Sequence, residues 1–347
     1  MGKNNKKIGA ALAAAAFAKK GNLRSWWSMG DGEKAEHNRI NTIRKNGILR
    51  AGISGQVPGF SQKGPDGNYT GIDIDYVKAL ALVILGDSTK VEFIELTSKE
   101  RFDALKNGTV DVLARNTTWT HERDSNKELT FVGVNFYDGQ GFMTKEDLGV
   151  KSARELSGAS IAVIDGTTTQ LNLKTYFKEQ RMEYTEVLVK DNNELMEALA
   201  EGKADVITAD SSALAGLRLK NQDISLSILP EIISKEPLGP VVNHGDEIFA
   251  DLARWVLNVM IEAEEKGITS LNIDTKSDPT SAKLLGQDEK FGDKLDLPNT
   301  WAYDIIKEIG NYGEIFERNL IESRIIKERS INELWTKGGI LYVPPLR

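Results

Sequence analysis

The sequence predicts an α/β protein built from two similar lobes, and two observations lead to this expectation. Apolar strands and amphipathic helices alternate in the order β-α-β-α-β, which is typical of a mainly parallel sheet with helices on both faces, and this series occurs twice. In addition, residues 104–116 (ALKNGTVDVLARN) align without gaps with residues 198–210 (ALAEGKADVITAD), 94 positions later (198 minus 104). Each segment reads as a helix end, a glycine, a strand and a polar residue. We therefore expect Asn116 and Asp210 at equivalent positions of two similar lobes.

The first series begins at residue 39. Its helices are expected to end at glycines, which accept the left-handed conformation that closes a helix. Its strands are short apolar runs. The expected elements are a helix over 39–46, a strand over 48–53, a glycine- and proline-rich loop through Asn68, a helix over 74–85, a strand over 91–96, a helix over 98–107 and a strand over 110–114.

The second series is expected to contain a strand over 160–164, a helix from the loop at 165–170 to about residue 180, a strand over 184–190 and a helix over 192–201. Further helices are predicted over 246–266, 279–285, 300–309 and 312–320, followed by an irregular end over 335–347. Segments 136–143 and 237–242 mix strand formers with glycine or proline, as a hinge between lobes requires. The predicted division is lobe 1 over 39–138, lobe 2 over 139–240, and a return to lobe 1 with a helical C-terminal extension over 241–347.

The first 38 residues differ from the rest of the chain. Three lysines precede an uncharged, alanine-rich run that ends in Ala-Phe-Ala at residue 18. A basic segment, a short apolar core and such an ending are the parts of a secretory signal peptide, so we expect one over 1–18 and export of the protein. The alternative is an alanine-rich helical tail. Residues 19–38 have no sustained periodicity and are expected to form a flexible leader.

Composition excludes several classes of function. The 347 residues carry a formal net charge of −7, which argues against nucleic-acid binding because phosphates require a positive surface. Cysteine is absent and the three histidines lack ligand-like spacing, so we expect neither disulfides nor a metal site. We also expect no cofactor.

The loop over 115–124 (RNTTWTHERD) is the first candidate for a ligand site. It follows the predicted buried strand over 110–114, and open α/β sheets bind ligands at the carboxyl ends of their strands. Hydroxyls and amides can hold a small anion, and an arginine adds a bidentate clamp on a carboxylate. The alternative is a surface loop whose threonines cap the next element.

Two further features belong at strand ends of the second lobe. The loop around Gly166, with the sequence DGTTTQ, leads into a helix whose N-terminus is suited to an anion, unless it is only an ordinary cap. Asp210 follows a strand and could cap a helix or pair with a ligand ammonium. Together these groups complement a zwitterion such as a free α-amino acid.

No catalytic pattern is present. The sequence contains no GxSxG, HExxH, GxxxxGK[ST] or complete GxGxxG motif, and no nucleophile is placed beside a histidine. Asp73 and Asp75 precede the helix predicted over 74–85, where we expect them to cap it rather than to share a proton. The sequence therefore predicts a protein without catalytic residues.

Several long segments resemble a known family. GIDIDYVKAL, LTSKERFDALKNGTVDVLARNTTWTHERD and YDGQGFM resemble bacterial extracellular solute-binding proteins for polar amino acids. KEPLGPVVNHGDE, IEAEEKGITS, WAYDIIKEIGNYGEIFERN and LWTKGGILYVPP resemble the subgroup that serves general L-amino-acid ABC transporters. The resemblance covers roughly residues 42–347. It implies a hinge-linked, two-lobed periplasmic-binding-protein fold of type II. The resemblance further implies that the lobes close on an L-amino acid and that the protein accepts a broad range of them.

The resemblance also implies roles for individual residues. Arg123 would hold the α-carboxylate of the ligand with help from Thr118 and Thr168, and Asp210 would pair with the α-ammonium while Asn116 contributes from the first lobe. The residues implied near the side-chain pocket are Ser54, Phe60 and Ser98. The implied partners are a free L-amino acid and the membrane subunits of an ABC permease, and the implied state is a periplasmic monomer. Two other hypotheses remain, namely an enzyme on the same scaffold, such as a small-acid dehydratase, and a sensory binding module.

Overall fold

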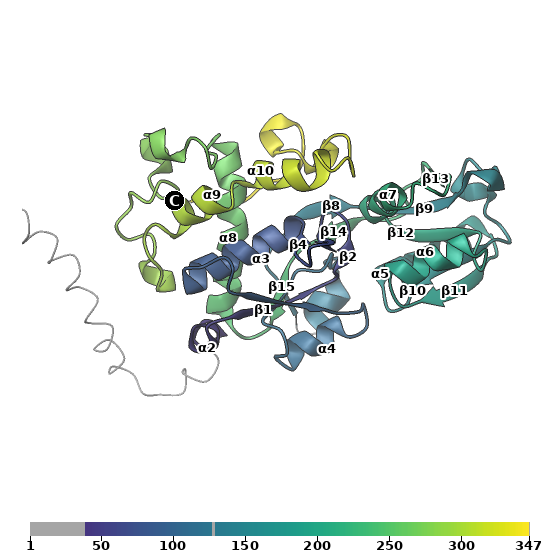
Figure 1. Ribbon diagram of the computed structural model, residues 1–347, viewed down its shortest axis with the longest axis horizontal. Coiled ribbons are helices and arrows are strands. Elements are labelled where there is room, and N and C mark those ends of the chain that lie inside the picture. The colour runs from purple at the N-terminus through teal and green to yellow at the C-terminus, as the bar shows by residue number, and fades with distance from the viewer. Residues whose placement is uncertain (1–38, 127–128, 347) are drawn as a thin grey trace, which may run out of the picture. The chain divides into compact units, whose positions relative to one another are not determined.

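The protein is described by a computed structural model that covers residues 39–126 and 129–346 (Figure 1). The signal peptide and the leader predicted over 1–38 lie outside the described residues. These described residues belong to one compact unit. In the described part of the chain, no helix has both the length and the apolar character needed to cross a lipid bilayer.

Strands and helices alternate over most of the chain. The strands are β1 (Leu49–Ile53), β2 (Gln56–Val57), β3 (Ser61–Lys63), β4 (Tyr69–Thr70), β5 (Val91–Glu95), β6 (Val112–Leu113), β7 (Leu129–Phe131), β8 (Phe136–Asp138), β9 (Gln140–Lys145), β10 (Ser160–Ile164), β11 (Thr185–Val189), β12 (Val206–Asp210), β13 (Leu226–Ile228), β14 (Glu236–Leu238) and β15 (Val241–Asn243). The α-helices are α2 (Arg39–Asn46), α3 (Ile72–Leu85), α4 (Arg101–Lys106), α5 (Thr168–Gln180), α6 (Asn192–Ala200), α7 (Ser211–Lys220), α8 (Glu247–Glu265), α9 (Trp301–Glu308) and α10 (Tyr312–Phe316).

Two five-stranded sheets share one topology, which confirms the predicted pair of similar lobes. The sheet of lobe 1 has the strand order β5-β1-β6-β15-β7, and the sheet of lobe 2 has the order β11-β10-β12-β9-β13. In each sheet the first three strands are parallel and the fourth is antiparallel to its neighbours. The equivalent strands β6 and β12 lie at the centres of the two sheets, so Asn116, which follows β6, and Asp210, the last residue of β12, lie at the carboxyl ends of corresponding strands.

Helices cover both faces of each sheet because the side chains of a strand point alternately to its two sides. In β6, Val112 packs in the hydrophobic cluster that contains α3, whereas Leu113 packs in the cluster of α4. Lobe 2 repeats this arrangement, with Ile161 and Ala162 on opposite sides. Figure 1 shows α5 and α6 beside the strands of lobe 2.

The chain crosses between the two sheets at paired segments. Strands β8 and β14 form a two-stranded antiparallel sheet, and they lead directly into β9 of lobe 2 and β15 of lobe 1. Both crossings fall within or beside the predicted hinge segments. Gly239 follows β14, and a Cβ atom there would lie 1.9 Å from the carbonyl oxygen of Gly133. Two backbones therefore approach so closely at this hinge that a side chain does not fit.

The C-terminal extension packs against lobe 1 and contacts the hinge. Helices α8, α9 and α10 share one core with α3, and Trp301 is buried within it. The Arg329 guanidinium forms an ion pair with Glu264 at 2.5 Å. Asn332 accepts a hydrogen bond from the backbone N–H of Tyr137 at 2.7 Å and donates to its carbonyl at 2.9 Å. The extension thus holds strand β8 by its backbone.

Some predicted elements differ from the structure. Of the strand predicted over 110–114, only the two residues of β6 pair with neighbouring strands. The loop predicted through Asn68 contains the small sheet β2-β3-β4. The helix predicted over 279–285 is wrong, since only a 3₁₀ turn forms at Pro279–Ser281. Asp278 accepts bonds from the backbone and hydroxyl of Thr280 and from the hydroxyl of Ser281, and such local bonds compete with helix formation. Helix α7 and strands β7 and β13 were not predicted.

Candidate ligand-binding site

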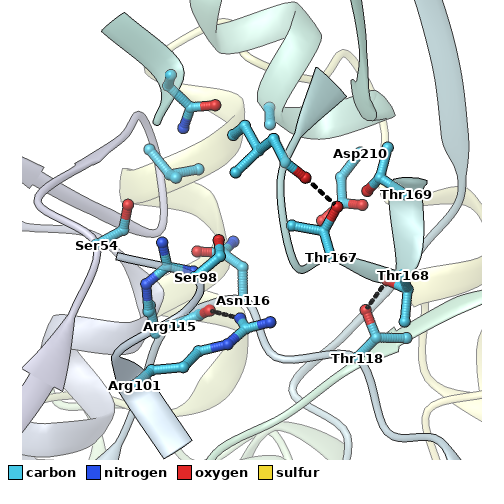
Figure 2. A pocket seen from close by; sticks show the side chains of 14 residues that line it. Ser54, Ser98, Arg101, Arg115, Asn116, Thr118, Thr167, Thr168, Thr169 and Asp210 are labelled. Atoms are coloured by element: carbon cyan, nitrogen blue, oxygen red, sulfur yellow. Dashed lines mark hydrogen bonds between the residues drawn. The ribbon is translucent and has the colours of Figure 1, made fainter. Parts of the chain in front are cut away.

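A cavity of about 70 Å³ lies where the carboxyl ends of strands from both sheets meet (Figure 2). Such strand ends are where open α/β sheets bind ligands. Lobe 1 supplies residues that follow β1, β5 and β6, and lobe 2 supplies residues that follow β10, β11 and β12. The lining residues are Ser54, Val57, Ser98, Arg101, Arg115, Asn116, Thr118, Ile164, Thr167, Thr168, Thr169, Asn192, Asp210 and Ala213.

The two lobes touch each other around this cavity. The hydroxyl oxygens of Thr118 and Thr168 are 3.3 Å apart, one from each lobe. The Lys99 ammonium of lobe 1 pairs with the Asp165 carboxylate of lobe 2 at 2.5 Å. The cavity is therefore bounded by both lobes in this conformation.

Asn116 and Asp210 present hydrogen-bond acceptors to the cavity. Asn116 has a φ of 45°, a left-handed conformation that is uncommon for residues other than glycine, and its buried Oδ1 has no hydrogen-bond partner among the described residues. Asp210 occupies the N-cap position of α7, but its side chain makes no capping hydrogen bond. Asp210 thus stands at the start of α7, as the capping alternative expects, but its carboxylate, like Asn116 Oδ1, is available to a donor in the cavity.

Asp73 holds the Asn116 backbone in place. Its Oδ2 accepts from the Asn116 backbone N–H at 3.2 Å, and its Oδ1 accepts from Asn135 Nδ2 at 2.9 Å. The expectation that Asp73 and Asp75 cap α3 is wrong, because α3 starts after Gly71 and no side chain caps it. Asp75 instead pairs with Arg318 at 2.8 Å.

The N-terminus of α5 supplies donors from lobe 2. Thr167 caps this helix, because its hydroxyl accepts from the Gln170 backbone N–H and donates to the Ile164 carbonyl. Thr168 and Thr169, at the start of the helix, line the cavity. Free N–H groups and the helix dipole favour an anion at such a position.

Glu236 is a site residue that sequence reasoning missed. Its carboxylate is buried and accepts hydrogen bonds from Thr118 at 2.6 Å and Thr168 at 3.1 Å, which belong to different lobes. Asn172 and Ser234 donate to its other oxygen at 2.7 and 2.6 Å. Nothing in its sequence context separates it from an exposed acidic residue, so no local pattern could have found it.

Three arginines surround the lobe 1 side of the site, and they are placed differently. Arg101 and Arg115 line the cavity, whereas Arg123 does not. Arg123 is buried, donates from Nη1 to the Thr118 carbonyl at 2.8 Å and lies over the Phe102 ring. Burial lowers the pKa of Arg123 and that of Arg115, the latter to about 10, so Arg115 stays cationic at neutral pH.

Arg101 is the first residue of helix α4, where a cation opposes the helix dipole. This unfavourable placement is the sequence signal that could have identified Arg101 as a site residue.

The three residues expected near the side-chain pocket separate into two groups. Ser54 and Ser98 line the cavity. Phe60 lies in the hydrophobic core, fully buried, with its ring centroid 5.1 Å from that of Phe136, and it is not among the lining residues. The ligand contacts of all three remain predictions.

Three carboxyl groups near the hinge, of buried Asp73 and of half-buried Asp138 and Asp210, make the stability of the unliganded protein depend on pH. Burial raises the pKa of Asp73 and of Asp138 from 3.8 to about 6 each. Burial, together with the charges of Asp138 and Glu236, also raises the pKa of Asp210 well above its ordinary value. A carboxyl group that holds its proton more tightly when folded stabilises the fold most at low pH and loses this contribution as the pH rises from about 4 to about 6.

We therefore expect the free energy of unfolding to be larger at pH 5 than at pH 7, by about 1–3 kcal/mol. Urea denaturation of the ligand-free protein at the two pH values measures this difference. The Asp210→Asn variant is the control, and its free energy of unfolding should differ less between pH 5 and pH 7 than that of the wild type. A protein that is less stable at pH 5 than at pH 7 contradicts the assignment of raised pKa values.

Comparison with known proteins gives consistent results. Residues 49–213 match the model of the family described as bacterial extracellular solute-binding proteins, family 3. The chain is 44% identical to the general L-amino acid-binding periplasmic protein of Rhizobium johnstonii over 99% of both chains. It is also 44% identical to the glutamate/glutamine/aspartate/asparagine-binding protein of Rhodobacter capsulatus, over 90% of this chain and 94% of that one.

Among solved structures, a periplasmic binding protein from Brucella ovis with glutathione bound matches with a TM-score of 0.86. It is 45% identical, and the alignment covers 89% of this chain and 99% of that one. The alignment with the Rhizobium protein covers 99% of this chain and therefore includes the C-terminal extension. The chain therefore has the type II periplasmic-binding-protein fold that its sequence predicts.

Proposed function

This chain belongs to the bacterial extracellular solute-binding proteins of family 3, and we propose that it is an extracytoplasmic receptor that binds free L-amino acids and delivers them to a membrane ABC permease. The Rhizobium and Rhodobacter relatives are named as amino-acid-binding proteins. The family and these relatives are solute-binding proteins rather than enzymes. Their names thus support a receptor.

The observation that carries the proposal is a pair of acceptors in one cavity that have no hydrogen-bond partner in residues 39–126 and 129–346. Asn116 Oδ1 and the Asp210 carboxylate come from different lobes, and an ammonium group has three donors that could satisfy both. The N-terminus of α5, where Thr168 and Thr169 lie, offers backbone N–H donors to a carboxylate on the other side of the site. A free α-amino acid carries both an ammonium and a carboxylate. The arrangement in Figure 2 therefore fits a zwitterion better than a simple anion or cation.

Lobe closure supplies the mechanism. The ligand is expected to contact lobe 1 first, through Asn116 and Thr118, and closure then adds Thr168 and Asp210 from lobe 2. A ligand can drive such a change only through contacts that the closed state makes and the open state lacks. The paired strands β8 and β14 are the segments that would absorb the movement.

A thermal-shift panel tests the proposed function. We expect many of the twenty L-amino acids to raise the midpoint of unfolding, because a ligand that binds only the folded state stabilises it by mass action. The corresponding decarboxylated amines should give no shift, since they lack the α-carboxylate, and the D-amino acids should give smaller shifts. If no L-amino acid shifts the midpoint, the receptor assignment is wrong for this chain.

A further inference from the structure

Two cationic side chains in the cavity, those of Arg101 and Arg115, have no anionic partner within the part of the chain that the structure describes. Arg101 is only 3% exposed, and its Nε has no hydrogen-bond partner among the described residues. Its Nη1 reaches the Arg115 carbonyl at 3.5 Å, the long limit of a hydrogen bond. Within the described residues, neither Arg101 nor Arg115 forms an ion pair with a carboxylate.

Burial of a guanidinium without a partner is costly, and proteins normally pair such a group. The Arg115 side chain is partly satisfied, because its Nε donates to the Leu96 carbonyl at 2.7 Å. Arg101 is supported mainly by stacking, with its guanidinium carbon 4.7 Å from the centre of the Phe102 ring. Its remaining donors are therefore suited to an anion that is not part of this chain.

Figure 2 shows where such an anion would lie. Arg101 and Arg115 belong to lobe 1, on the side of Ser54 and Ser98, away from Asp210. A ligand whose ammonium meets Asp210 would thus direct another group towards the two arginines. The cavity that holds Asp210 is lined by both arginines, so one ligand can reach all three groups.

We propose that this site prefers amino acids whose side chain carries a second carboxylate, and that Arg101, assisted by Arg115, binds that carboxylate. Arg101 is then a specificity-determining residue. A guanidinium forms two parallel charge-assisted bonds with a carboxylate but only weaker bonds with a neutral amide of the same shape. The inference rests on the proposed function, because it assumes that the α-ammonium is bound at Asp210.

Isothermal titration calorimetry with L-glutamate and L-glutamine at pH 7 tests the inference, since these ligands differ in side-chain charge and hardly in shape. We expect the wild-type protein to bind glutamate at least about tenfold more tightly than glutamine, as charge-assisted bonds are about twice as strong as neutral ones. In Arg101→Met the preference should vanish through loss of glutamate affinity, while glutamine affinity stays within about threefold. Arg218→Met, which removes an exposed arginine of α7, is the control and should keep the preference.

The outcomes separate this inference from the general receptor function. Equal wild-type affinities for glutamate and glutamine would overturn the preference for a second carboxylate and leave the amino-acid receptor intact. Equal losses for both ligands in Arg101→Met would show that Arg101 holds the α-carboxylate instead. If Arg101→Met does not fold, Arg101→Lys replaces it, because lysine keeps the cation without the fork and should reduce the preference.

Discussion

Asp210→Asn should abolish amino-acid binding and leave the ligand-free protein folded and at least as stable as the wild type. The carboxylate is the charged acceptor of the cavity that no hydrogen bond of the described chain satisfies. Removal of one partner of a buried charge pair costs about 3–5 kcal/mol, which corresponds to an affinity loss of about 10²–10³-fold or more. Because burial and neighbouring charges raise the pKa of Asp210, its ionised form disfavours the folded state near pH 7.

Asp210→Asn should therefore lower the affinity for amino acids without lowering the stability of the ligand-free protein. Calorimetric titration measures the loss of affinity, and thermal unfolding without ligand should show an unchanged or higher midpoint. Asp147→Asn is the matched control, since it removes an exposed carboxylate from lobe 2 and should change neither quantity. A variant that binds with wild-type affinity would remove Asp210 from the site, and one that is much less stable would assign it a structural role.

Arg123→Ala should also reduce amino-acid affinity by about two orders of magnitude, and the protein should remain folded. Its guanidinium donates to the Thr118 carbonyl and thereby positions the loop whose threonine hydroxyl faces the cavity. It is also the buried cation whose pKa is sensitive to Glu236 and Asp210, so its removal leaves both acidic groups with less compensation. The expected loss follows from the cost of breaking a buried charge network.

Arg123→Lys distinguishes positioning from direct contact. Lysine keeps the charge but cannot reproduce the planar fork. If Arg123 clamps the ligand carboxylate, Arg123→Lys should lose most of the affinity that Arg123→Ala loses. If it acts mainly through the Thr118 carbonyl and its positive charge, Arg123→Lys should keep binding within about tenfold. Near-normal affinity in Arg123→Ala would refute both roles.

The sequence alone determined the class of fold and the neighbourhood of the site. Strands such as β10 and helices such as α6 form nearly where their periodicity predicts, because apolar spacing reports the buried face of an element. The echo between 104–116 and 198–210 identified two corresponding strands and hence the equivalent positions of Asn116 and Asp210. Both residues line one cavity, as the topology of two similar sheets requires.

Only the tertiary structure decided which side chains share the cavity and which lie behind it. Arg101, Arg115 and Arg123 look alike in a sequence, yet their surroundings differ. The buried Nε of Arg101 has no hydrogen-bond partner among the described residues, the Nε of Arg115 donates to a carbonyl, and Arg123 supports a loop from behind the cavity. Glu236 meets Thr118 and Thr168 across 118 and 68 positions of chain. Such contacts depend on how the hinge brings the two sheets together. No local sequence pattern encodes them, because hydrogen bonding between distant segments is set by the fold as a whole.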